Sequence, residues 1–559
     1  MKNYFLFPFL CIASLVFAQP PGPAQAAATG TSGGTLPDSL VRKVDAVFAA
    51  FASDASPGCA LVVLRDGQVH YQQGYGMANL EHGVAIGPAS VFHVASLTKQ
   101  FTAAAIVRLA LAGKLSLADD VRKYVPEVPD LGHVITLTHL LHHTSGLRDQ
   151  WDLHRLAGWR GTDVISEADI LEMTGRQRGL NFAPGEAFSY SNTGYTLLGL
   201  VVKKVAGMPL RAYADSVFFR PLEMHHTHFQ GDHAEVTPKR TSAYQQDPQG
   251  RWKVSVPAYD NYGATGLMTT VADLARWDAY LYAAGAGNAA FGRAMLSAGR
   301  LNDQTPLLYA SGLALQDYKG HPVVWHPGSD AGYRSVYLHF PGSRLSVIVL
   351  GNAAGLNAES LAKKVADLLL PESPVAAYPP AAKMDSTALK AWAGTYLDTT
   401  ANATLVIGYR AGLLAKGNDP LVAVSGHTFA DWKANATYAF TGAAARTALE
   451  VRTKGNRKVT YRKVEPAALL PDRLGEYAGW FYSPELDVWY TLSLREGALV
   501  AKVPRNVPFP LEPLTKDVFT GPVIVAFTRD ATRNITGFWL TLGKTQNLRF
   551  RKAARPAGL

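Results

Sequence analysis

Ser96 and Lys99 place a hydroxyl and an amine three positions apart. They open the apolar segment SLTKQFTAAAIVRLALAGKL, which predicts a buried helix that ends near Gly113. Positions i and i+3 share a helix face, so the lysine amine can lie beside the serine hydroxyl. Burial disfavours the charged form of a lysine, and a serine hydroxyl needs a base to become a nucleophile. The Ser-x-x-Lys pattern alone is weak, because a serine helix cap followed by a surface lysine looks the same.

A second polar group, Tyr190-Ser191-Asn192, lies in GEAFSYSNTGYTLLGLVV, where a polar turn runs into an apolar helix. A tyrosine phenol can pass a proton between a nucleophile and a leaving group, and an asparagine amide can hold both Lys99 and a substrate carbonyl. The alternative is a helix cap formed by Ser191 or Asn192, with Tyr190 packed as an ordinary aromatic residue.

A third group, His326-Pro327-Gly328-Ser329, precedes the strand-like segment SVYLHF. Gly328 would let a substrate backbone approach a strand edge, and the N–H of Ser329 could complete an oxyanion hole. The alternative for His326 is an ordinary histidine in a solvated loop.

Five other histidines do not form a metal-binding pattern. The pair His142 and His143 and the group His225, His226 and His228 lack the i, i+4 spacing of a zinc-binding helix. Although His226 and His228 could chelate weakly, roles in loops and packing fit them better. The sequence therefore predicts chemistry that uses neither a metal nor a cofactor.

The three motifs together resemble the serine β-lactamase and penicillin-binding-protein superfamily. Tyr-x-Asn follows Ser-x-x-Lys by roughly 90 residues, and His-x-Gly follows about 135 residues later. The resemblance covers about residues 38 to 370. Four segments resemble the class C branch of this superfamily, which includes D-alanyl-D-alanine carboxypeptidases, D-aminopeptidases and esterases. They are PGCALVVLRDGQVHYQQGYGMANLE, ITLTHLLHHTSGL, FSYSNTGYTLLGLVV and ATGLMTTVADLARW.

This resemblance implies three catalytic residues. Ser96 would be the nucleophile that is acylated, and Lys99 would be its general base. Tyr190 would be a base or acid that works together with Lys99.

The same resemblance implies a substrate-binding set. Asn192 would be a substrate-binding amide, while His326 and Gly328 would occupy the third motif. The backbone N–H groups of Ser96 and Ser329 would hold the oxyanion. Class C β-lactamases have lysine where this chain has His326, whereas the peptidase and some esterase relatives have histidine. This departure favours peptide or ester substrates over β-lactams.

The expected function is hydrolysis through an acyl-enzyme on Ser96, of peptides or amides that contain a D-residue, such as a cell-wall fragment. An esterase of small acyl esters and a β-lactamase are the nearest alternatives. A receptor that binds penicillin or peptidoglycan without turnover belongs to another class, and the lifetime of the acyl-enzyme would distinguish it. The expected partner is a small peptide, amide or ester, and the oligomeric state is left open.

The catalytic motifs lie in a segment, residues 38–372, with strands near both ends and helices between them. CALVVLRDGQVHYQQGYG predicts a hairpin that turns at Asp66-Gly67, and SVYLHF and LSVIVLGN predict two strands joined across residues 341–344. We expect one α+β domain of the β-lactamase/transpeptidase type, with an antiparallel sheet that is closed by the two sequence ends and flanked by helices.

A linker over residues 373–387 is followed by a repeated strand-like region. WAGTY at 392–396 returns as YAGWF at 477–481, RAG at 410–412 as REG at 495–497, and YRK at 461–463 as FRK at 550–552. Two ordered copies predict two small antiparallel barrels or sandwiches, over residues 388–466 and 467–559. One catalytic domain followed by two barrels also resembles bacterial D-aminopeptidases.

The N-terminal residues MKNYFLFPFLCIASLVFAQP predict a secretory signal peptide over 1–18, with cleavage after Ala18 and a flexible linker over 19–37. We therefore expect an exported protein, periplasmic or secreted, without a transmembrane segment in its mature chain. Cleavage would leave Cys59, within a strand-like run, as the only cysteine and a small buried hydrophobe. The formal net charge of +10 is scattered, so nucleic acid is not an expected partner.

Overall fold

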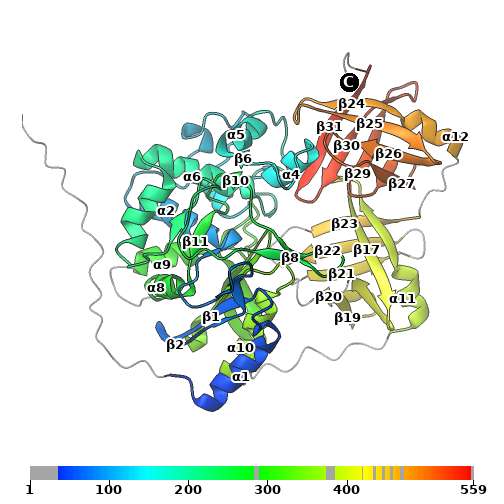
Figure 1. The fold of residues 1–559 in the computed structure, drawn as a ribbon. Coiled ribbons are helices and arrows are strands. Elements are labelled where there is room, and N and C mark those ends of the chain that lie inside the picture. Colours follow the sequence, from blue (N-terminus) through cyan, green and yellow to red (C-terminus); the bar gives the residue numbers. More distant parts are fainter. Residues whose placement is uncertain are drawn as a thin grey trace, which may run out of the picture.

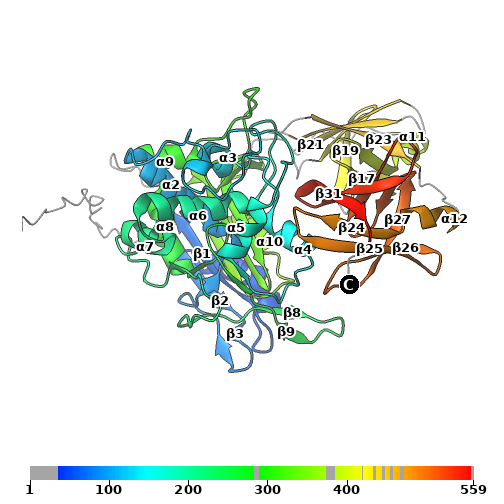
Figure 2. The same ribbon diagram turned by 90° about the horizontal axis from the view of Figure 1, so that it is seen from above.

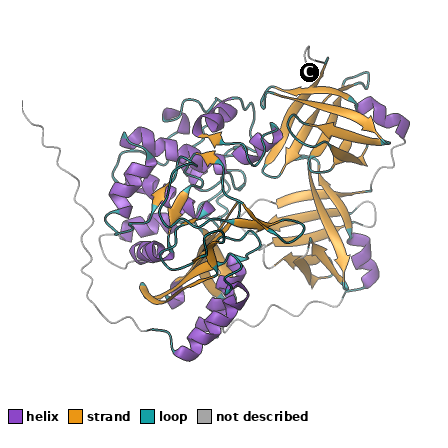
Figure 3. Cartoon of the chain, viewed as in Figure 1, coloured by secondary structure: helices purple, strands orange, loops and turns teal. Residues whose placement is uncertain are grey.

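The computed structural model describes residues 35–282, 289–372, 384–417, 419–431, 436–442, 447–453, 458–465 and 471–555 (Figure 1). The predicted signal peptide and all but the last three residues of the predicted linker 19–37 lie outside these ranges. No helix within them is long and apolar enough to cross a membrane. A mixed helical and stranded domain lies beside two domains that consist mainly of strands (Figures 2 and 3).

The predicted catalytic domain is organised around a six-stranded antiparallel sheet of order β12-β13-β14-β15-β1-β2. Its strands are β1 (Cys59–Arg65), β2 (Gln68–Tyr75), β12 (Ala314–Tyr318), β13 (His321–Asp330), β14 (Tyr333–Phe340) and β15 (Leu345–Gly351). The first and last of the predicted strands pair directly, because β1 lies against β15 along its whole length. The predicted closure of the sheet by the two sequence ends is thus confirmed.

Both faces of the sheet are covered, which explains why β1 is apolar from Cys59 to Leu64. Leu61 and Val63 join a core with α1 (Asp38–Phe48) and α10 (Ala358–Leu369), and Cys59 is fully buried there as predicted. Ala60 and Val62 join the larger core on the opposite face. Successive side chains of a strand point to opposite faces, so a strand buried on both sides has no polar positions.

The larger core is built around α2 (Thr98–Leu111), which is buried almost all round as the sequence predicts. The predicted hairpin turn also occurs: Asp66 (φ 56°) and Gly67 (φ 76°) adopt the left-handed conformation that a tight hairpin requires. The other helices of this domain are α3 (Leu137–Leu141), α4 (Gln150–Leu156), α5 (Glu167–Gly175), α6 (Asn192–Ala206), α7 (Leu210–Ala214), α8 (Val271–Tyr282) and α9 (Ala289–Leu296).

Short strands complete the domain around this helical layer. A three-stranded sheet of order β5-β11-β7 lies beside the start of α2. The short strands are β3 (Met77–Asn79), β4 (Val84–Ala85), β5 (Phe92–His93), β6 (Ile165–Ser166), β7 (His228–Phe229), β8 (Tyr244–Gln246), β9 (Trp252–Val254), β10 (Tyr259–Asp260) and β11 (Leu267–Thr269).

The two repeated regions each form a closed antiparallel barrel, so the predicted barrel-like domains are confirmed. The first consists of β16 (Gly394–Asp398), β17 (Ala403–Arg410), β18 (Leu413–Lys416), β19 (Asp419–Ser425), β20 (Thr428–Asp431), β21 (Ala436–Thr441), β22 (Ala448–Thr453) and β23 (Lys458–Val464). The second consists of β24 (Gly479–Ser483), β25 (Val488–Arg495), β26 (Ala498–Lys502), β27 (Phe509–Thr515), β28 (Val518–Thr520), β29 (Ile524–Arg529), β30 (Ile535–Leu542) and β31 (Thr545–Ala553). The helices α11 (Ser386–Trp392) and α12 (Pro471–Leu474) precede them, and α11 begins inside the predicted linker 373–387.

The repeated residues occupy equivalent places in the two barrels. Gly394 and Gly479 begin the first strand of each, with φ of 143° and 148°. A Cβ on either would lie 2.7 Å from Lys463 Cε or 2.9 Å from Lys552 Cε, the last residues of the repeated YRK and FRK. Glycine is therefore required where a lysine from the closing strand crosses the first strand.

The second barrel packs directly on the catalytic domain. Its core includes Leu153 and Leu156 of α4, the helix between the two domains in Figure 1. The Arg148 guanidinium lies 2.6 Å from Glu485 Oε2 of the barrel, and the two side chains are only 4% and 6% exposed. An ion pair buried at this contact fixes the barrel against the segment that leads into α4.

We expect the conservative change Glu485→Gln to lower the free energy of unfolding by about 3 kcal/mol, because it leaves the buried Arg148 charge uncompensated. Asp487→Asn is the matched control, since Asp487 pairs with Arg176 at 3.3 Å with 54% of its side chain exposed. A surface pair of this kind contributes less than about 1 kcal/mol. Urea unfolding followed by tryptophan fluorescence measures both, and equal shifts would contradict the assigned role of Glu485.

Candidate active site

Ser96 lies in a tight turn that precedes the buried helix. The 3-10 turn Ala95–Leu97 leads into α2, whose first residue is Thr98. Ala95 has a φ of 49°, an uncommon conformation for a residue with a side chain, and its N–H donates to His93 Nδ1 at 3.3 Å. Strain of this kind persists only where surrounding contacts hold it. It presents Ser96 to a cavity rather than to the core.

Lys99 is fully buried, and its ammonium nitrogen has three partners. Nζ lies 2.7 Å from the carbonyl oxygen of Ala264, 2.8 Å from Asn192 Oδ1 and 3.3 Å from Ser96 Oγ. A neutral amine has two N–H donors, which the two shorter contacts would use. Its lone pair would then face the Ser96 hydroxyl, as a general base requires.

The surroundings of Lys99 favour this neutral form. Burial holds its pKa well below the ordinary value, and the nearby positive charge of Lys544 acts in the same direction. The carboxylates of Asp149 and Asp330 act against both, without cancelling them. Burial disfavours a charge whose partners do not fully replace water. Activity that depends on neutral Lys99 should therefore rise with pH as the amine loses its proton.

Asn192, the first residue of α6, is held from both ends of its amide. Its Oδ1 accepts from Lys99, while its Nδ2 and its backbone N–H each donate to Asp149 Oδ2 at 2.8 Å. Asp149 Oδ1 in turn caps α4 by accepting from the N–H of Trp151 at 3.1 Å. Asn192 faces the cavity, and only one Nδ2 hydrogen remains for a substrate carbonyl.

Tyr190 lies against the same lysine. Lys99 Nζ is 4.7 Å from the centre of its ring, and His143 packs on that ring at 4.2 Å between ring centres. Burial raises the pKa of Tyr190, and the nearby Ser96 hydroxyl acts in the opposite direction. The Tyr190 hydroxyl and the Ser96 hydroxyl do not form a hydrogen bond of ordinary geometry. A phenol that keeps its proton suits the role of acid toward a leaving group better than that of base.

His326 is not among the residues that line the cavity beside Ser96, and its predicted role as a substrate contact stays a prediction. Its Nδ1 donates to the carbonyl oxygen of Pro327 at 2.7 Å, and its Nε2 lies 3.1 Å from the hydroxyl of Tyr309. It is 3% exposed, and burial lowers its pKa to about 3, so the ring is neutral at physiological pH. The ring packs behind Tyr190, with 6.0 Å between the ring centres.

Gly328 packs against the turn that carries Ser96, whereas Ser329 lies on the cavity wall. A Cβ on Gly328 would lie 2.1 Å from Ser335 Oγ and 2.5 Å from the carbonyl oxygen of Val94, so the missing side chain makes room for that turn. The approach of a substrate backbone to the edge of β13 at Gly328 stays a prediction. Ser329 lines the cavity together with Ser96, which is compatible with an oxyanion hole built from their N–H groups.

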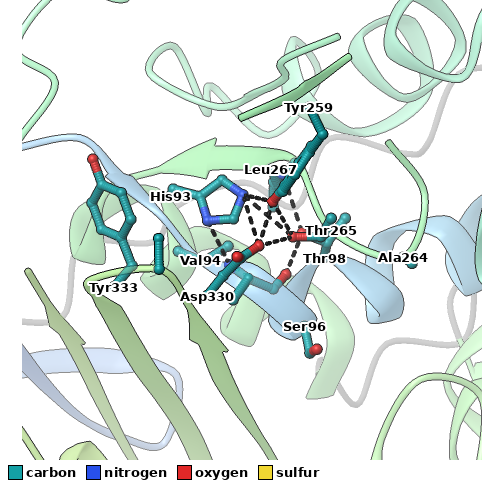
Figure 4. Close-up of polar contacts among 12 residues, drawn as sticks. His93, Val94, Ser96, Thr98, Tyr259, Ala264, Thr265, Leu267, Asp330 and Tyr333 are labelled. Carbon is teal, nitrogen blue, oxygen red and sulfur yellow. Dashed lines mark hydrogen bonds and ion pairs between the residues drawn. The ribbon is translucent and has the colours of Figure 1, made fainter. Parts of the chain in front are cut away.

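A polar cluster beside Ser96 has no counterpart in the sequence motifs (Figure 4). The Tyr259 hydroxyl donates to Asp330 and lies 2.9 Å from both His93 Nε2 and Thr265 Oγ1. Thr265 Oγ1 also donates to Asp330 Oδ2 at 3.1 Å. The cluster joins the strand that holds Ser329, the loop that holds Ala264 and the strand before Ser96. It therefore positions the predicted oxyanion groups relative to Lys99.

A cavity of about 980 Å³ connects these groups. Ser96, Tyr190, Asn192 and Ser329 lie on its wall, and Lys99 lies behind Ser96. Within the described ranges, the one group of three side chains close enough to share a metal ion is Asp232, His233 and Asp260, and none of these lines the cavity. The arrangement can activate a serine for attack on a carbonyl and can stabilise the oxyanion that forms.

We expect Lys99→Arg to lower turnover by roughly two to four decades, because a guanidinium cannot release its proton to serve as a base. Lys114→Arg, at an exposed position just beyond α2, is the matched control and should leave turnover unchanged. Rates with an activated ester, and circular dichroism to verify folding, decide the matter. Wild-type turnover in folded Lys99→Arg would transfer the role of base to another group, Tyr190 first.

Comparison with known proteins gives a consistent result. A family model described as Beta-lactamase matches residues 40–371. The chain is 28% identical over 323 residues to a D-aminopeptidase of Gluconobacter oxydans, which covers 57% of this chain and 60% of that protein. It is 27% identical over 473 residues to a D-aminopeptidase of Cereibacter sphaeroides, which covers 83% of this chain and 86% of that protein.

The chain thus spans about three fifths of the length of the first of these relatives. The structure of the octameric penicillin-binding protein homologue from Pyrococcus abyssi is similar in fold, with a TM-score of 0.53 and 21% sequence identity. The similarity covers 88% of this chain and 98% of that chain. Since the family model spans more than half of the sequence and the site lies within it, the chain belongs to the β-lactamase family.

Proposed function

We propose that this protein hydrolyses peptides or amides that contain a D-residue, through an acyl-enzyme on Ser96. The observation that carries the proposal is the buried Lys99 amine, 3.3 Å from Ser96 Oγ and held by Asn192 and Ala264. The similarity to D-aminopeptidases supports the substrate class. The chain has His326 where class C β-lactamases have a lysine, and this difference supports amide or ester substrates over β-lactams.

The residues suggest the following sequence of bond changes. Ser96 Oγ attacks the substrate carbonyl carbon while its proton passes to Lys99, and the oxyanion receives hydrogen bonds from the N–H groups of Ser96 and Ser329. The C–N bond then breaks, and the leaving nitrogen takes a proton from Tyr190, which recovers one from Lys99. A water molecule loses a proton to the same base and attacks the Ser96 ester. The acid product leaves, and the serine regains its proton.

A substrate panel tests the proposal. We expect the kcat/KM for D-alanine p-nitroanilide or a D-Ala-D-Ala peptide to exceed that for the L-alanine anilide and for a chromogenic cephalosporin, with p-nitrophenyl acetate as a general ester. Ser96→Ala should abolish all turnover and all labelling by a fluorophosphonate. Faster turnover of the cephalosporin than of every other compound would favour a β-lactamase. Labelling without turnover would favour a receptor.

We also propose that the protein is exported, with cleavage after Ala18. Support comes from the lysine followed by an apolar run and small residues in the first 18 positions. N-terminal sequencing of protein recovered from the periplasm or medium should begin at Gln19. Protein that remains in the cytoplasm and starts at Met1 would contradict export.

A further inference from the structure

One residue of the cavity wall comes from outside the catalytic domain. Lys544 belongs to the two-residue turn Gly543-Lys544 between β30 and β31 of the second barrel, and it lines the same cavity as Ser96, Tyr190 and Asn192. The three motifs of the catalytic domain give no function to a lysine of a distant β-hairpin.

The backbone of this hairpin is fixed at its tip. The Lys544 N–H donates to Asp152 Oδ2 at 2.7 Å, and the Lys544 carbonyl oxygen accepts from Asn181 Nδ2 at 2.8 Å. A Cβ on Gly543 would lie 2.9 Å from Asp152 Oδ2, so the turn is in close contact with α4. These contacts do not involve the Lys544 side chain, and they hold its Cα at a set position on the cavity wall.

The base of the hairpin is held equally well. Arg148 donates to the carbonyl oxygens of Gln546 at 3.1 Å and Asn547 at 2.9 Å, while it also forms the buried ion pair with Glu485. The first barrel contributes the carbonyl oxygen of Thr400, which accepts from Asn547 Nδ2 at 2.9 Å. A lysine on such a support loses less freedom when it binds a ligand than one on a loose loop.

The Lys544 ammonium itself is available. Within the part of the chain that the structure describes, it forms no hydrogen bond, and 43% of the side chain is exposed. The nearest carboxylate oxygen, Asp149 Oδ2, lies 3.9 Å away and already accepts two hydrogen bonds from Asn192. Lys544 Nζ lies 4.7 Å from the centre of the Tyr190 ring, the same distance as Lys99 Nζ. The two nitrogens are therefore within twice that distance of each other.

Other cations of the cavity are placed differently. Lys99 lies behind Ser96 in surroundings that favour its neutral form, and Arg160 is paired with Asp163 at 2.7 Å. Arg155 lines the cavity from α4 and is exposed, but it has no contact with Tyr190. His326, at the position where class C β-lactamases have a lysine, is neutral and buried. Lys544 is thus the cation held beside the catalytic tyrosine.

We propose that Lys544 forms a carboxylate-binding subsite, so that the preferred substrates carry a carboxylate close to the bond that is cleaved. An ammonium with free donors, held over an aromatic ring in a partly enclosed cavity, attracts a carboxylate. The inference rests on the proposed hydrolase function and refines its substrate class to acidic acyl groups or free C-terminal acids.

Two matched substrate pairs test this subsite on the full-length protein. The first is p-nitrophenyl hemisuccinate against p-nitrophenyl butyrate, in which the carboxylate is on the acyl side. The second is a D-residue peptide with a free C-terminal carboxylate against its C-terminal amide, in which it is on the leaving side. Within each pair the reacting bond is the same, so the ratio of kcat/KM values for anionic and neutral substrate cancels any general effect on Ser96 or Lys99.

We expect Lys544→Gln to lower this ratio about tenfold or more in at least one pair, mainly through KM, since hydrogen bonds to charged groups carry such energies. Lys544→Arg should retain most of the ratio, and Lys544→Glu should reverse the preference. Lys502→Gln, at an exposed position of the same barrel, is the control for a remote charge. Arg155→Gln is the control for the general field of the cavity.

The outcomes separate the two proposals. An unchanged ratio in Lys544→Gln, or an equal fall in Arg155→Gln, overturns the subsite even if D-residue substrates are hydrolysed. A ratio that falls only in the Lys544 variants supports the subsite even if the esters are the only substrates, a result that would overturn the D-peptide function alone. Failure of the wild-type protein to react with any of the four compounds counts against both.

Discussion

The burial of a single amine determines how the rest of the site is built. Lys99 can act as a base only without its proton, and a lysine in water keeps that proton at physiological pH. Its place on α2, inside a core that buries this helix nearly all round, removes the water that would favour the ammonium. The acceptors that remain, Asn192 Oδ1 and the Ala264 carbonyl oxygen, match the two N–H groups of a neutral amine and leave its lone pair toward Ser96. Each neighbouring element is held so that these two acceptors stay in place.

Asp149 shows how far this requirement extends. One carboxylate oxygen orients Asn192, and the other caps α4, the helix on which the second barrel packs. The neighbouring Arg148 carries the buried ion pair with that barrel and also holds the hairpin of Lys544. Arg148 and Asp149 are neighbours in one loop. Through them, the orientation of Asn192, which holds Lys99, is linked to the docking of the second barrel. The second barrel therefore contacts both the loop that orients Asn192 and, through Lys544, the wall of the cavity.

The sequence predicts contacts that depend on local spacing, but it does not predict several contacts between segments that are far apart in the chain. Ser96 and Lys99 come together because i and i+3 share a helix face, and the barrels follow from residues repeated in order. The motif His326-Pro327-Gly328 marks the right strand, but its spacing does not show that Gly328 packs against the turn of Ser96 or that His326 packs against Tyr309. The cluster of His93, Tyr259 and Asp330 joins three separate segments, and no spacing along the chain reveals it. Lys544 lies in a hairpin turn, as Lys319 and Lys516 do, and only the docking of the barrel distinguishes it.

The charge arrangement gives a physical reason why the anion-binding cation should come from another domain. A lysine at position 326 would be buried beside Tyr309 and Tyr190 and close to Lys99, where an ammonium would carry a large desolvation cost. A neutral imidazole fills the same place with both nitrogens satisfied. Lys544 approaches from the solvent side, where 43% exposure limits its desolvation and Asp149 partly balances its charge. From there it still reaches Lys99 electrostatically and helps to hold that amine neutral. One exposed cation can thus attract an anionic substrate and favour the free base, two effects that a buried cation at position 326 would combine only at a large desolvation cost.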